Sequence, residues 1–445
     1  MWYNLGRDCT TFPKTQHNQA LLRTHNETHA KIQNNEENIM NQKKFPISTP
    51  QPRRSAHTSL NSHALLAESR TQARSSFWDL VRGIGILSIV MGHSCRQVIP
   101  YVYTYHLAVF FFVSGYLYNE KKYGLDPFGH IAAKLKNAWP KYMGYTSFYI
   151  LMHNLFQKTG INAPGETYSR SRILMALGNA IVFQGAELMG GTLWFVPVWI
   201  LACAVFGGII WFTRRFCPDK AIGPIPARPL LAGAASCFFG LIGCFLILRG
   251  LPLSYQLHLV FLVQPFFAVG WLIRSLFPTF KKLLKWYLAF PCALGLAFFV
   301  GRWQLYIDLS LGRIGNGWQF FFLAFLGIYC CMYLAFLLEA FTSQPFSPIH
   351  ENAALKKAAA ILAPTIRLIS LWGRYSFDIM AAHFFVFKLI DLLYGRFLMA
   401  HPLETYSGFP QAYAETLWPL YAILGTTLPA LLGLALEKAG RHLPA

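Results

Sequence analysis

Three ionisable side chains interrupt the apolar segment that begins at Phe77, and their spacing puts them on one face of a helix. The segment reads FWDLVRGIGILSIVMGHS and contains Asp79, Arg82 and His93. Arg82 and His93 are 11 residues apart, which in an α-helix comes within about 20° of three full turns. Asp79 precedes Arg82 by 3 residues and can pair with it. Ionisable groups at membrane depth are costly, so this stripe predicts a functional site.

Proton transfer and charge stabilisation are the chemistry that these residue types can support. An imidazole can act as a general base near neutral pH, and a guanidinium can hold a phosphate or a developing oxyanion. The same residues also fit a structural role, in which Asp79 and Arg82 form an ion pair near the cytoplasmic interface and His93 is a buried, hydrogen-bonded histidine. Which of the two holds depends on the helices around this segment.

The composition places the segment in a membrane protein. Of the 445 residues, 54% are hydrophobic and 13% are charged, against about 45–50% and about 25% in soluble domains. The formal charge is +20, but the cations outside the N-terminal region cluster in short loops between apolar runs, which is typical of membrane proteins and not of a nucleic-acid groove. We predict an all-α polytopic membrane protein without a nucleic-acid partner. The nine cysteines show no metal-ligand spacing, so no metal is assigned.

Apolar runs predict the transmembrane helices, because a hydrocarbon core of about 30 Å takes roughly 20 helical residues. We count ten runs, at about residues 77–95, 103–118, 139–156, 193–212, 230–248, 257–277, 286–300, 318–341, 373–394 and 417–437. A shorter run, Ile173–Phe183, is expected at the interface or as a re-entrant segment, with an eleventh span as the alternative. Residues 76–440 thus form the expected ten-helix domain.

Lys and Arg in alternate loops predict the orientation, because cytoplasmic loops retain cations. One set of four loops holds 17 cations, whereas the other set of five holds 8. Both termini are therefore expected in the cytoplasm. With 1.5 Å per residue from Phe77, Arg82 would lie about 8 Å and His93 about 24 Å into the membrane.

Residues 1–75 differ in composition from the rest of the chain. They are rich in Asn, Gln, Thr, Ser, His and Arg and contain no sustained apolar period or signal peptide. We expect a disordered polar and basic cytoplasmic extension, with a mis-assigned start codon as the alternative.

Four motifs in order resemble those of the acyltransferase 3 family of integral-membrane acyltransferases. Arg82, ten intervening residues and His93 match the arginine-to-histidine motif of the family's first span. The other motifs are Tyr105–Leu117 (YHLAVFFFVSGYL), Gly191–Pro197 (GTLWFVP) and Tyr375–His383 (YSFDIMAAH). The resemblance covers about residues 77–437, and the residues around Arg82 are most similar to the fucose 4-O-acetyltransferase-like branch.

The resemblance implies transfer of an acyl group, usually acetyl from coenzyme A, to a hydroxyl of a surface or secreted saccharide. Because an alcohol is a poor nucleophile near neutral pH, His93 is expected to take its proton. Arg82, with Asp79 beside it, is expected on the donor phosphate or the oxyanion. The expected partners are acetyl-CoA as donor substrate, a saccharide or lipid-linked saccharide as acceptor, and the bilayer of a bacterial inner membrane. No bound cofactor is expected.

Further residues are candidates for substrate binding. The candidates for the acceptor and the acyl chain are Ser114, Gly115, His106, Trp194, Phe195 and His383. Each has a structural alternative: helix packing for the Ser-Gly pair, interfacial anchoring for the aromatic pair, and a supporting role for the histidines. The candidates for the donor phosphate are Lys134, Lys136 and Lys141, although related proteins often carry two arginines there and ordinary positive-inside charge is the alternative. No constellation selects among the further acids Glu166, Glu187, Asp308 and Asp391.

A transporter or flippase for a saccharide or an acyl group is the alternative function, because ten spans with a polar interior would serve it too. Transporters tend to show inverted repeats with broken helices, whereas this sequence has no clear internal symmetry. The sequence also contains no Gly-rich phosphate loop, no HExxH helix and no GxSxG elbow, which gives no support to P-loop hydrolases, zincins or serine esterases.

Overall fold

The computed structural model describes residues 76–162, 165–185, 187–217, 221–222, 225–342, 353–402 and 410–442. This part of the chain is helical apart from short loops and one antiparallel pair of two-residue strands, β1 (Ala221–Ile222) and β2 (Ile225–Pro226). The predicted all-α class is therefore confirmed for it. The expected extension, residues 1–75, lies outside the described residues.

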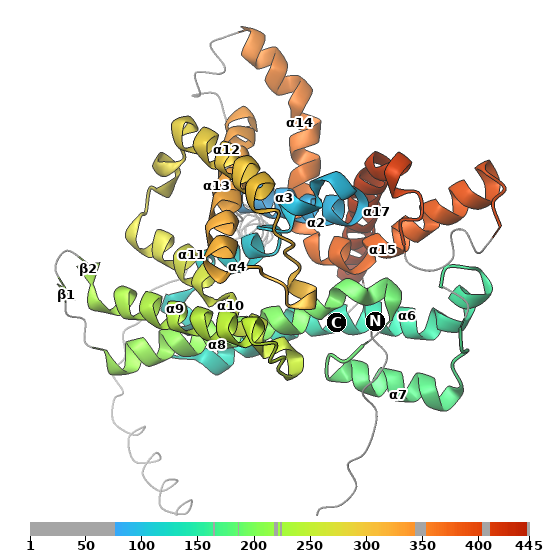
Figure 1. Ribbon diagram of the computed structural model, residues 1–445, viewed down its shortest axis with the longest axis horizontal. Coiled ribbons are helices and arrows are strands. Elements are labelled where there is room, and N and C mark those ends of the chain that lie inside the picture. Colours follow the sequence, from blue (N-terminus) through green and yellow to red (C-terminus); the bar gives the residue numbers. More distant parts are fainter. Residues whose placement is uncertain are drawn as a thin grey trace, which may run out of the picture. The chain divides into compact units, whose positions relative to one another are not determined.

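Figure 1 shows the order of the helices along the described chain. Those before β1 are α2 (Ser76–Ser94), η1 (Arg96–Val98), α3 (Ile99–Val102), α4 (Ala108–Tyr116), α5 (Glu120–Tyr123), α6 (Pro127–Lys158), α7 (Arg170–Ile181), η2 (Leu188–Trp194) and α8 (Phe195–Phe216). Those after β2 are α9 (Ala227–Leu248), η3 (Ser254–Gln256), α10 (Leu257–Leu262), α11 (Gln264–Leu276), η4 (Phe280–Leu283), α12 (Trp286–Trp303), η5 (Leu309–Leu311), α13 (Gly317–Thr342), α14 (Ala353–Arg374), α15 (Ser376–Leu392), η7 (Leu393–Leu398) and α17 (Ala414–His442).

Five helices of the described chain are long and apolar enough to cross a membrane, so the predicted count of ten is not confirmed. They are Leu188–Phe216, Ala227–Leu248, Trp286–Trp303, Gly317–Phe341 and Ala414–Gly440. The structure has a sixth candidate span if η3 and α10 (Ser254–Leu262) together with α11, whose axes differ by 44°, form one broken span. The expected second span contains only the 9-residue α4, which at 1.5 Å per residue covers less than half of a core of about 30 Å.

α7 covers most of the short apolar run at Ile173–Phe183 and turns back along α6. The side chain of Ser169 accepts a hydrogen bond from the amide of Arg172 and so begins the helix. At the other end of α7, Trp139 Nε1 of α6 donates to the carbonyl of Ile181 at 3.1 Å. The two helices therefore run antiparallel in contact.

α2 lies at the centre of the packing, where it contacts α4, α13, α14, α15 and α17. The crossing of α2 and α14 is close. A Cβ at Gly83 would overlap the carbonyl oxygen of Ile369, and a Cβ at Gly373 would overlap that of Asp79. Glycine at both positions therefore permits the approach. The sequence does not predict α14, which lies almost entirely between the expected spans at about residues 318–341 and 373–394.

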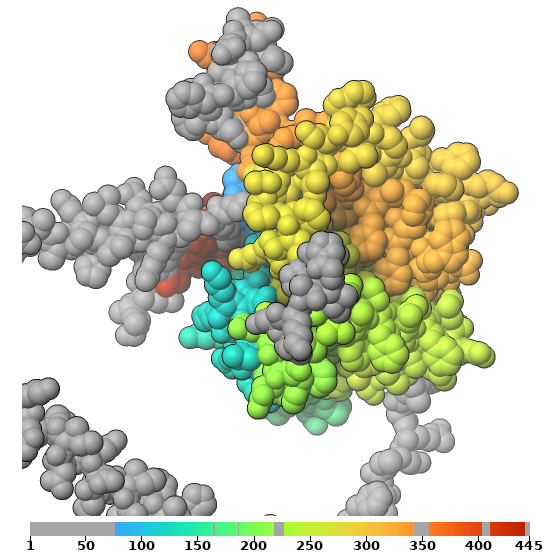
Figure 2. All heavy atoms as spheres, turned by 90° about the vertical axis from the view of Figure 1, so that its left-hand side faces the viewer, coloured from blue at the N-terminus to red at the C-terminus, as the bar shows by residue number. Residues whose placement is uncertain are grey.

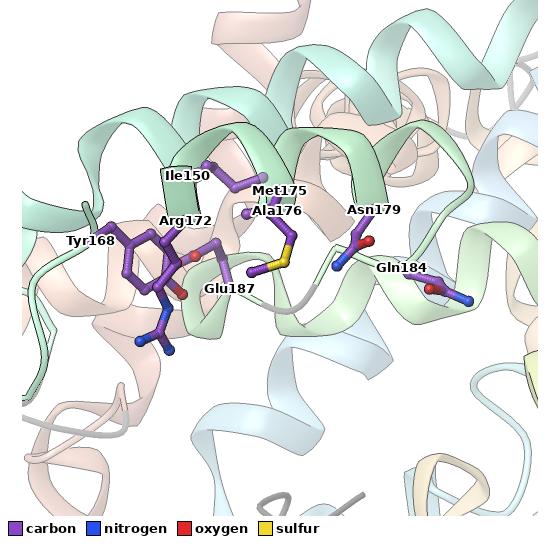
Figure 3. Close-up of a pocket in the computed structure, with 8 residues that line it drawn as sticks. All are labelled: Ile150, Tyr168, Arg172, Met175, Ala176, Asn179, Gln184 and Glu187. Atoms are coloured by element: carbon purple, nitrogen blue, oxygen red, sulfur yellow. The ribbon is translucent and has the colours of Figure 1, made fainter. Parts of the chain in front are cut away.

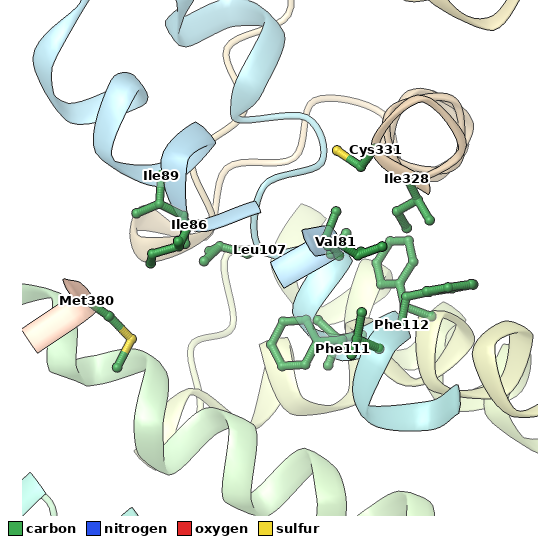
Figure 4. Close-up of a cluster of buried hydrophobic side chains, with 14 of the residues drawn as sticks. Val81, Ile86, Ile89, Leu107, Phe111, Phe112, Ile328, Cys331 and Met380 are labelled. Atoms are coloured by element: carbon green, nitrogen blue, oxygen red, sulfur yellow. The ribbon is translucent and has the colours of Figure 1, made fainter. Parts of the chain in front are cut away.

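One buried apolar cluster joins α2 to its neighbours (Figure 4). Side chains of α2, of α4 and the residue before it, of α13 and of α15 meet there, among them Val81, Ile86, Ile89, Leu107, Phe111, Phe112, Ile328, Cys331 and Met380. All nine are at least nine-tenths buried. This packing fixes the rotation of α2 and hence the direction of its polar side chains.

Figure 2 shows α12 (yellow) and α13 (orange) side by side on one face of the molecule. An apolar groove of about 490 Å³ between them is lined by Trp286, Ala289, Phe290, Ala293, Cys330, Tyr333 and Leu334. An apolar lining without charged groups is typical of a surface that faces lipid.

Candidate functional site

The polar stripe predicted on α2 lies on one continuous helix, Ser76–Ser94. The Arg82 guanidinium donates to the Asp79 carboxylate and, through Nε, to the carbonyl of Trp78 at 3.2 Å. Asp79 is buried, whereas the Arg82 side chain keeps 24% of its surface exposed. The structure thus brings Asp79 and Arg82 together as an ion pair at one end of α2 and places His93 near the other.

His93 forms a hydrogen bond with His383, which the chain supplies from α15. The distance from His93 Nδ1 to His383 Nε2 is 2.9 Å. The two rings are nearly parallel, with 4° between their planes and 5.1 Å between their centroids. Because this separation equals the nitrogen distance plus a ring radius on each side, the imidazoles meet edge to edge rather than face to face.

The partners of His383 fix the direction of this hydrogen bond. His383 is completely buried, and its Nδ1 lies 2.9 Å from the carbonyl oxygen of Ile379 and 3.0 Å from that of Met380. Carbonyl oxygens only accept, so Nδ1 carries the proton and Nε2 of the neutral ring is an acceptor. His93 must then donate from Nδ1, which leaves a lone pair on its own Nε2. His93 is only half-buried, so this nitrogen belongs to a ring that a substrate can approach.

Two further hydrogen bonds hold the turn of α15 that carries His383. Thr192 Oγ1, in η2, donates to the carbonyl of Met380 at 2.5 Å. Tyr149 OH, in α6, donates to the carbonyl of Ala381 at 2.9 Å. Sequence reasoning assigned no role to either residue: Thr192 lies in the GTLWFVP motif, and Tyr149 has no spacing that distinguishes it from other polar residues of an apolar helix. They connect the GTLWFVP motif and α6 to the histidine pair.

His106 lies near the pair without bonding to it. Its Nδ1 donates to the carbonyl of Val102 at 2.8 Å, and its ring stacks obliquely on Tyr103 at 4.8 Å. The ring of Tyr103 in turn lies 6.1 Å from that of His93. The structure therefore links His106 to His93 only through the ring of Tyr103, among the contacts of the described residues.

The Ser-Gly pair of α4 makes helix contacts. Ser114 Oγ donates to the carbonyl of Phe110 at 2.7 Å and accepts from Trp199 Nε1 at 2.9 Å. Gly115 packs directly against the backbone of Phe267 in α11. These contacts fit the alternative in which Ser114 and Gly115 serve helix packing rather than substrate binding.

The aromatic pair of the GTLWFVP motif lies at the junction of η2 and α8. The ring centroids of Trp194 and Phe195 are 6.2 Å apart, and Phe195 packs on Phe111 at 5.2 Å. Both residues are half-buried. Phe195 therefore packs on α4 with part of its surface still accessible.

The three candidate lysines on α6 lie in different environments. Lys141 Nζ is 2.9 Å from the buried carboxylate of Asp378, which also accepts from Tyr145 OH at 3.0 Å. Lys134 Nζ lies over the ring of Trp199 at 5.0 Å, and Lys136 is exposed. Lys141 is thus held in an ion pair with Asp378. Lys134 and Lys136 are the candidates with more freedom to reach a donor.

The remaining acids have local partners. Glu166 pairs with Arg172 at 2.7 Å, Glu187 accepts from His153 Nδ1 at 2.9 Å, and Asp308 accepts from the amide of Ser310 at 3.0 Å. Asp391 accepts from Tyr421 OH and from the backbone amides of Gln411 and Ala412. Within the described ranges no group of three or more His, Cys, Asp or Glu side chains is arranged to hold a metal ion.

A comparison with known families identifies the class of this protein. A family model described as an acyltransferase domain matches residues 75–437. No curated protein and no solved structure matches the chain. The matched region contains α2, the histidine pair and, apart from the last three residues of Ala414–Gly440, the helices that are long and apolar enough to cross a membrane. The chain therefore belongs to the acyltransferase 3 family.

Proposed function

We propose that the protein transfers an acyl group, acetyl in the first instance, from acyl-CoA to a hydroxyl of a surface or secreted saccharide, with His93 as the general base. The directed hydrogen bond between the two imidazoles carries this proposal, because it leaves the His93 Nε2 lone pair for a proton. Membership of an acyltransferase family supports the reaction class. The fucose 4-O-acetyltransferase-like motif around Arg82 supports acetyl and a sugar hydroxyl.

The chemistry requires one proton acceptor close to both substrates. His93 Nε2 accepts the hydroxyl proton while the oxygen bonds to the carbonyl carbon of the thioester. The carbon–sulfur bond then breaks, the ester forms, and coenzyme A leaves as a thiolate that takes the proton from His93. His383 accepts from His93 Nδ1 throughout, so it holds the ring and stabilises the transient imidazolium. We assign His383 as a positioning residue.

Arg82 has a different task, because it is too far from His93 to act on the same atoms. Eleven residues on one straight helix separate them by about 16 Å. An acyl-CoA carries its phosphates and its thioester at opposite ends of the pantetheine arm. We assign the Arg82 guanidinium, held by Asp79, to the phosphate end of the donor, with Lys134 and Lys136 as further cations on that side.

The orientation of the substrates follows from the loop charges. The cation-rich loops of the sequence favour a cytoplasmic N-terminal end of α2, and in that orientation acyl-CoA would reach Arg82 from the cytoplasm. The acceptor, an exopolysaccharide, an O-antigen or its lipid-linked precursor, would reach His93 from the outer side of a bacterial inner membrane. The acyl group then crosses most of the bilayer along α2.

Deletion of the gene separates this function from transport, the alternative that the family match does not favour. The surface saccharide of the deletion strain is analysed by mass spectrometry. We expect the saccharide to persist and to lose one acetyl group per modified unit; loss of a heavier acyl group would identify succinyl transfer. Loss of the whole saccharide would indicate a transporter, and an unchanged saccharide would contradict the proposal.

A further inference from the structure

A polar pocket between α6 and α7 lies outside the histidine site. Its volume is about 170 Å³, and it is lined by Ile150, Tyr168, Arg172, Met175, Ala176, Asn179, Gln184 and Glu187 (Figure 3). Four of these residues, at positions 172, 175, 176 and 179, follow the spacing of one helix face. A cavity of about 150 Å³ holds one benzene ring, so this pocket has room for one six-membered ring.

Hydrogen bonds and ring contacts fix one end of the pocket in place. Asn154 of α6 donates to the carbonyl of Tyr168 at 2.9 Å and accepts from its amide at 2.6 Å. The Tyr168 ring is stacked on His153 with 3.5 Å between centroids, and the Arg172 guanidinium covers it at 4.7 Å. The pocket wall is thus formed before any ligand binds, which lowers the entropic cost of binding.

Glu187 brings a buried carboxylate to the wall of the pocket. Its side chain is 6% exposed, and one oxygen accepts from His153 Nδ1 at 2.9 Å. The second oxygen makes no hydrogen bond to any residue that the structure describes. Because Glu187 lines the pocket, this second oxygen is open to a ligand, and a ligand hydroxyl can donate a hydrogen bond to it.

The polar groups of the pocket suit a neutral ligand with several hydroxyls. The amides of Asn179 and Gln184 both donate and accept, and they lie at the end of the pocket opposite Tyr168 and Arg172 (Figure 3). Glu187 would repel a phosphate, and Arg172 is already paired with Glu166 at 2.7 Å. Polar side chains beside apolar ones suit a sugar ring, which has hydroxyl groups at its edge and apolar C–H groups on its faces.

We propose that this pocket binds one sugar unit of the acceptor saccharide, an inference that rests on the proposed function. The pocket shares its supporting elements with the histidine pair. Glu187 directly precedes η2, where Thr192 bonds the carbonyl of Met380 that also accepts from His383. Ile150 follows Tyr149, which bonds the next carbonyl of α15. A sugar held here would leave a neighbouring unit of the chain to reach His93.

Photo-cross-linking tests the pocket independently of catalysis. Met175→p-benzoylphenylalanine places the probe in the pocket, and Leu174→p-benzoylphenylalanine is the matched control, because the two side chains are similarly exposed, at 61% and 69%, and Leu174 lies outside the pocket lining. Both are made in full-length protein that carries His93→Ala, in cells that produce their own surface saccharide. We expect saccharide attached at position 175 at more than ten times the level at 174. Equal labelling, or none at 175, would overturn the proposal.

A blocking variant provides the second test, with wild-type His93. Met175→Trp fills the pocket and should lower saccharide acylation at least tenfold, whereas Leu174→Trp should retain it. Equal acylation by the two variants would contradict sugar binding in this pocket without contradicting the proposed acyl transfer. Cross-linking at position 175 in cells whose saccharide is never acylated would support the pocket and contradict the proposed acyl transfer.

Discussion

His93 and His383 are 290 residues apart in the sequence and share a hydrogen bond of 2.9 Å between Nδ1 of the first and Nε2 of the second. The carbonyls of Ile379 and Met380 hold the proton of His383 on its far nitrogen. This arrangement gives the two histidines different tasks. In the proposed reaction His93 acts as the base, and the hydrogen bond to His383 determines which nitrogen of His93 is free.

Replacement of His383 should therefore slow the reaction without weakening donor binding. We expect His383→Ala to lower kcat about 10²-fold, because a base that loses its orientation loses about that much, and to leave KM for acetyl-CoA unchanged. His383→Gln should retain more activity than His383→Ala, since its amide oxygen can accept from His93 Nδ1. Steady-state kinetics of the purified protein in nanodiscs measures both. Equal kcat for the two variants would argue against the directed hydrogen bond.

Thr192 should stabilise the turn of α15 that carries His383. Thr192→Val removes the hydroxyl that donates to the Met380 carbonyl and should destabilise the protein by about 1 kcal/mol. Thr159→Val is the control, because its hydroxyl bonds backbone carbonyls at the exposed end of α6. Thermal unfolding in detergent should show a lower Tm for the first variant only; equal Tm values would contradict the role given to Thr192.

The crossing of α2 and α14 should not tolerate a side chain at Gly83. We expect Gly83→Ala to cost about 1–3 kcal/mol, because the new methyl group would overlap the Ile369 backbone. Gly144→Ala in α6 is the control, since no atom outside its own helix lies within 4 Å of its added Cβ. That change should be neutral or stabilising. If Gly83→Ala unfolded at the same temperature as the control, the close crossing would be wrong.

Lys141 should matter for stability more than for the donor. Its ammonium is 2.9 Å from a carboxylate that is 2% exposed, whereas its own side chain is 47% exposed. Lys141→Met should therefore destabilise by about 1–3 kcal/mol, less than a fully buried pair would lose. The double variant Lys141→Met with Asp378→Asn should recover part of this loss.

Kinetics of the same variants separates the two roles of Lys141. The KM of Lys141→Met for acetyl-CoA is compared with that of Lys136→Met, which changes an exposed lysine of the same helix that the proposal places on the donor side. We expect KM for acetyl-CoA to stay unchanged in Lys141→Met. A rise of tenfold or more, with stability unchanged, would instead place Lys141 on the donor phosphate.

Local periodicity predicted the part of the site that lies on one helix. The stripe of Asp79, Arg82 and His93 follows from residue spacing alone, and the structure keeps all three on α2. The hydrogen bond between His93 and His383 could not be predicted in the same way, because it depends on how α15 packs against α2. Thr192 was missed for the same reason, since its partner is a backbone carbonyl that no sequence motif marks.

Hydropathy predicted the fold class better than the number of spans. Apolar runs identified α8, α9, α12, α13 and α17. α2 is not among the candidate membrane spans, because Asp79, Arg82 and His93 lower its hydropathy. α4 is not among them either, because it has only 9 residues. The 22-residue α14 lies almost entirely between two predicted apolar runs, and its lysines and arginines have the composition of a cation-rich loop. Charge counting cannot distinguish a basic amphipathic helix from such a loop.

Replacement of His93 is the most direct test of the central claim. Membranes that contain equal amounts of wild type, His93→Ala or His401→Ala are supplied with acetyl-CoA labelled in the acetyl group, and label in the saccharide fraction is measured. His401 bonds Tyr413 and serves as the histidine control. We predict that His93→Ala loses at least 10²-fold in rate and that His401→Ala retains the wild-type rate. Undiminished transfer by His93→Ala would contradict the account, because no base would then be needed at this position.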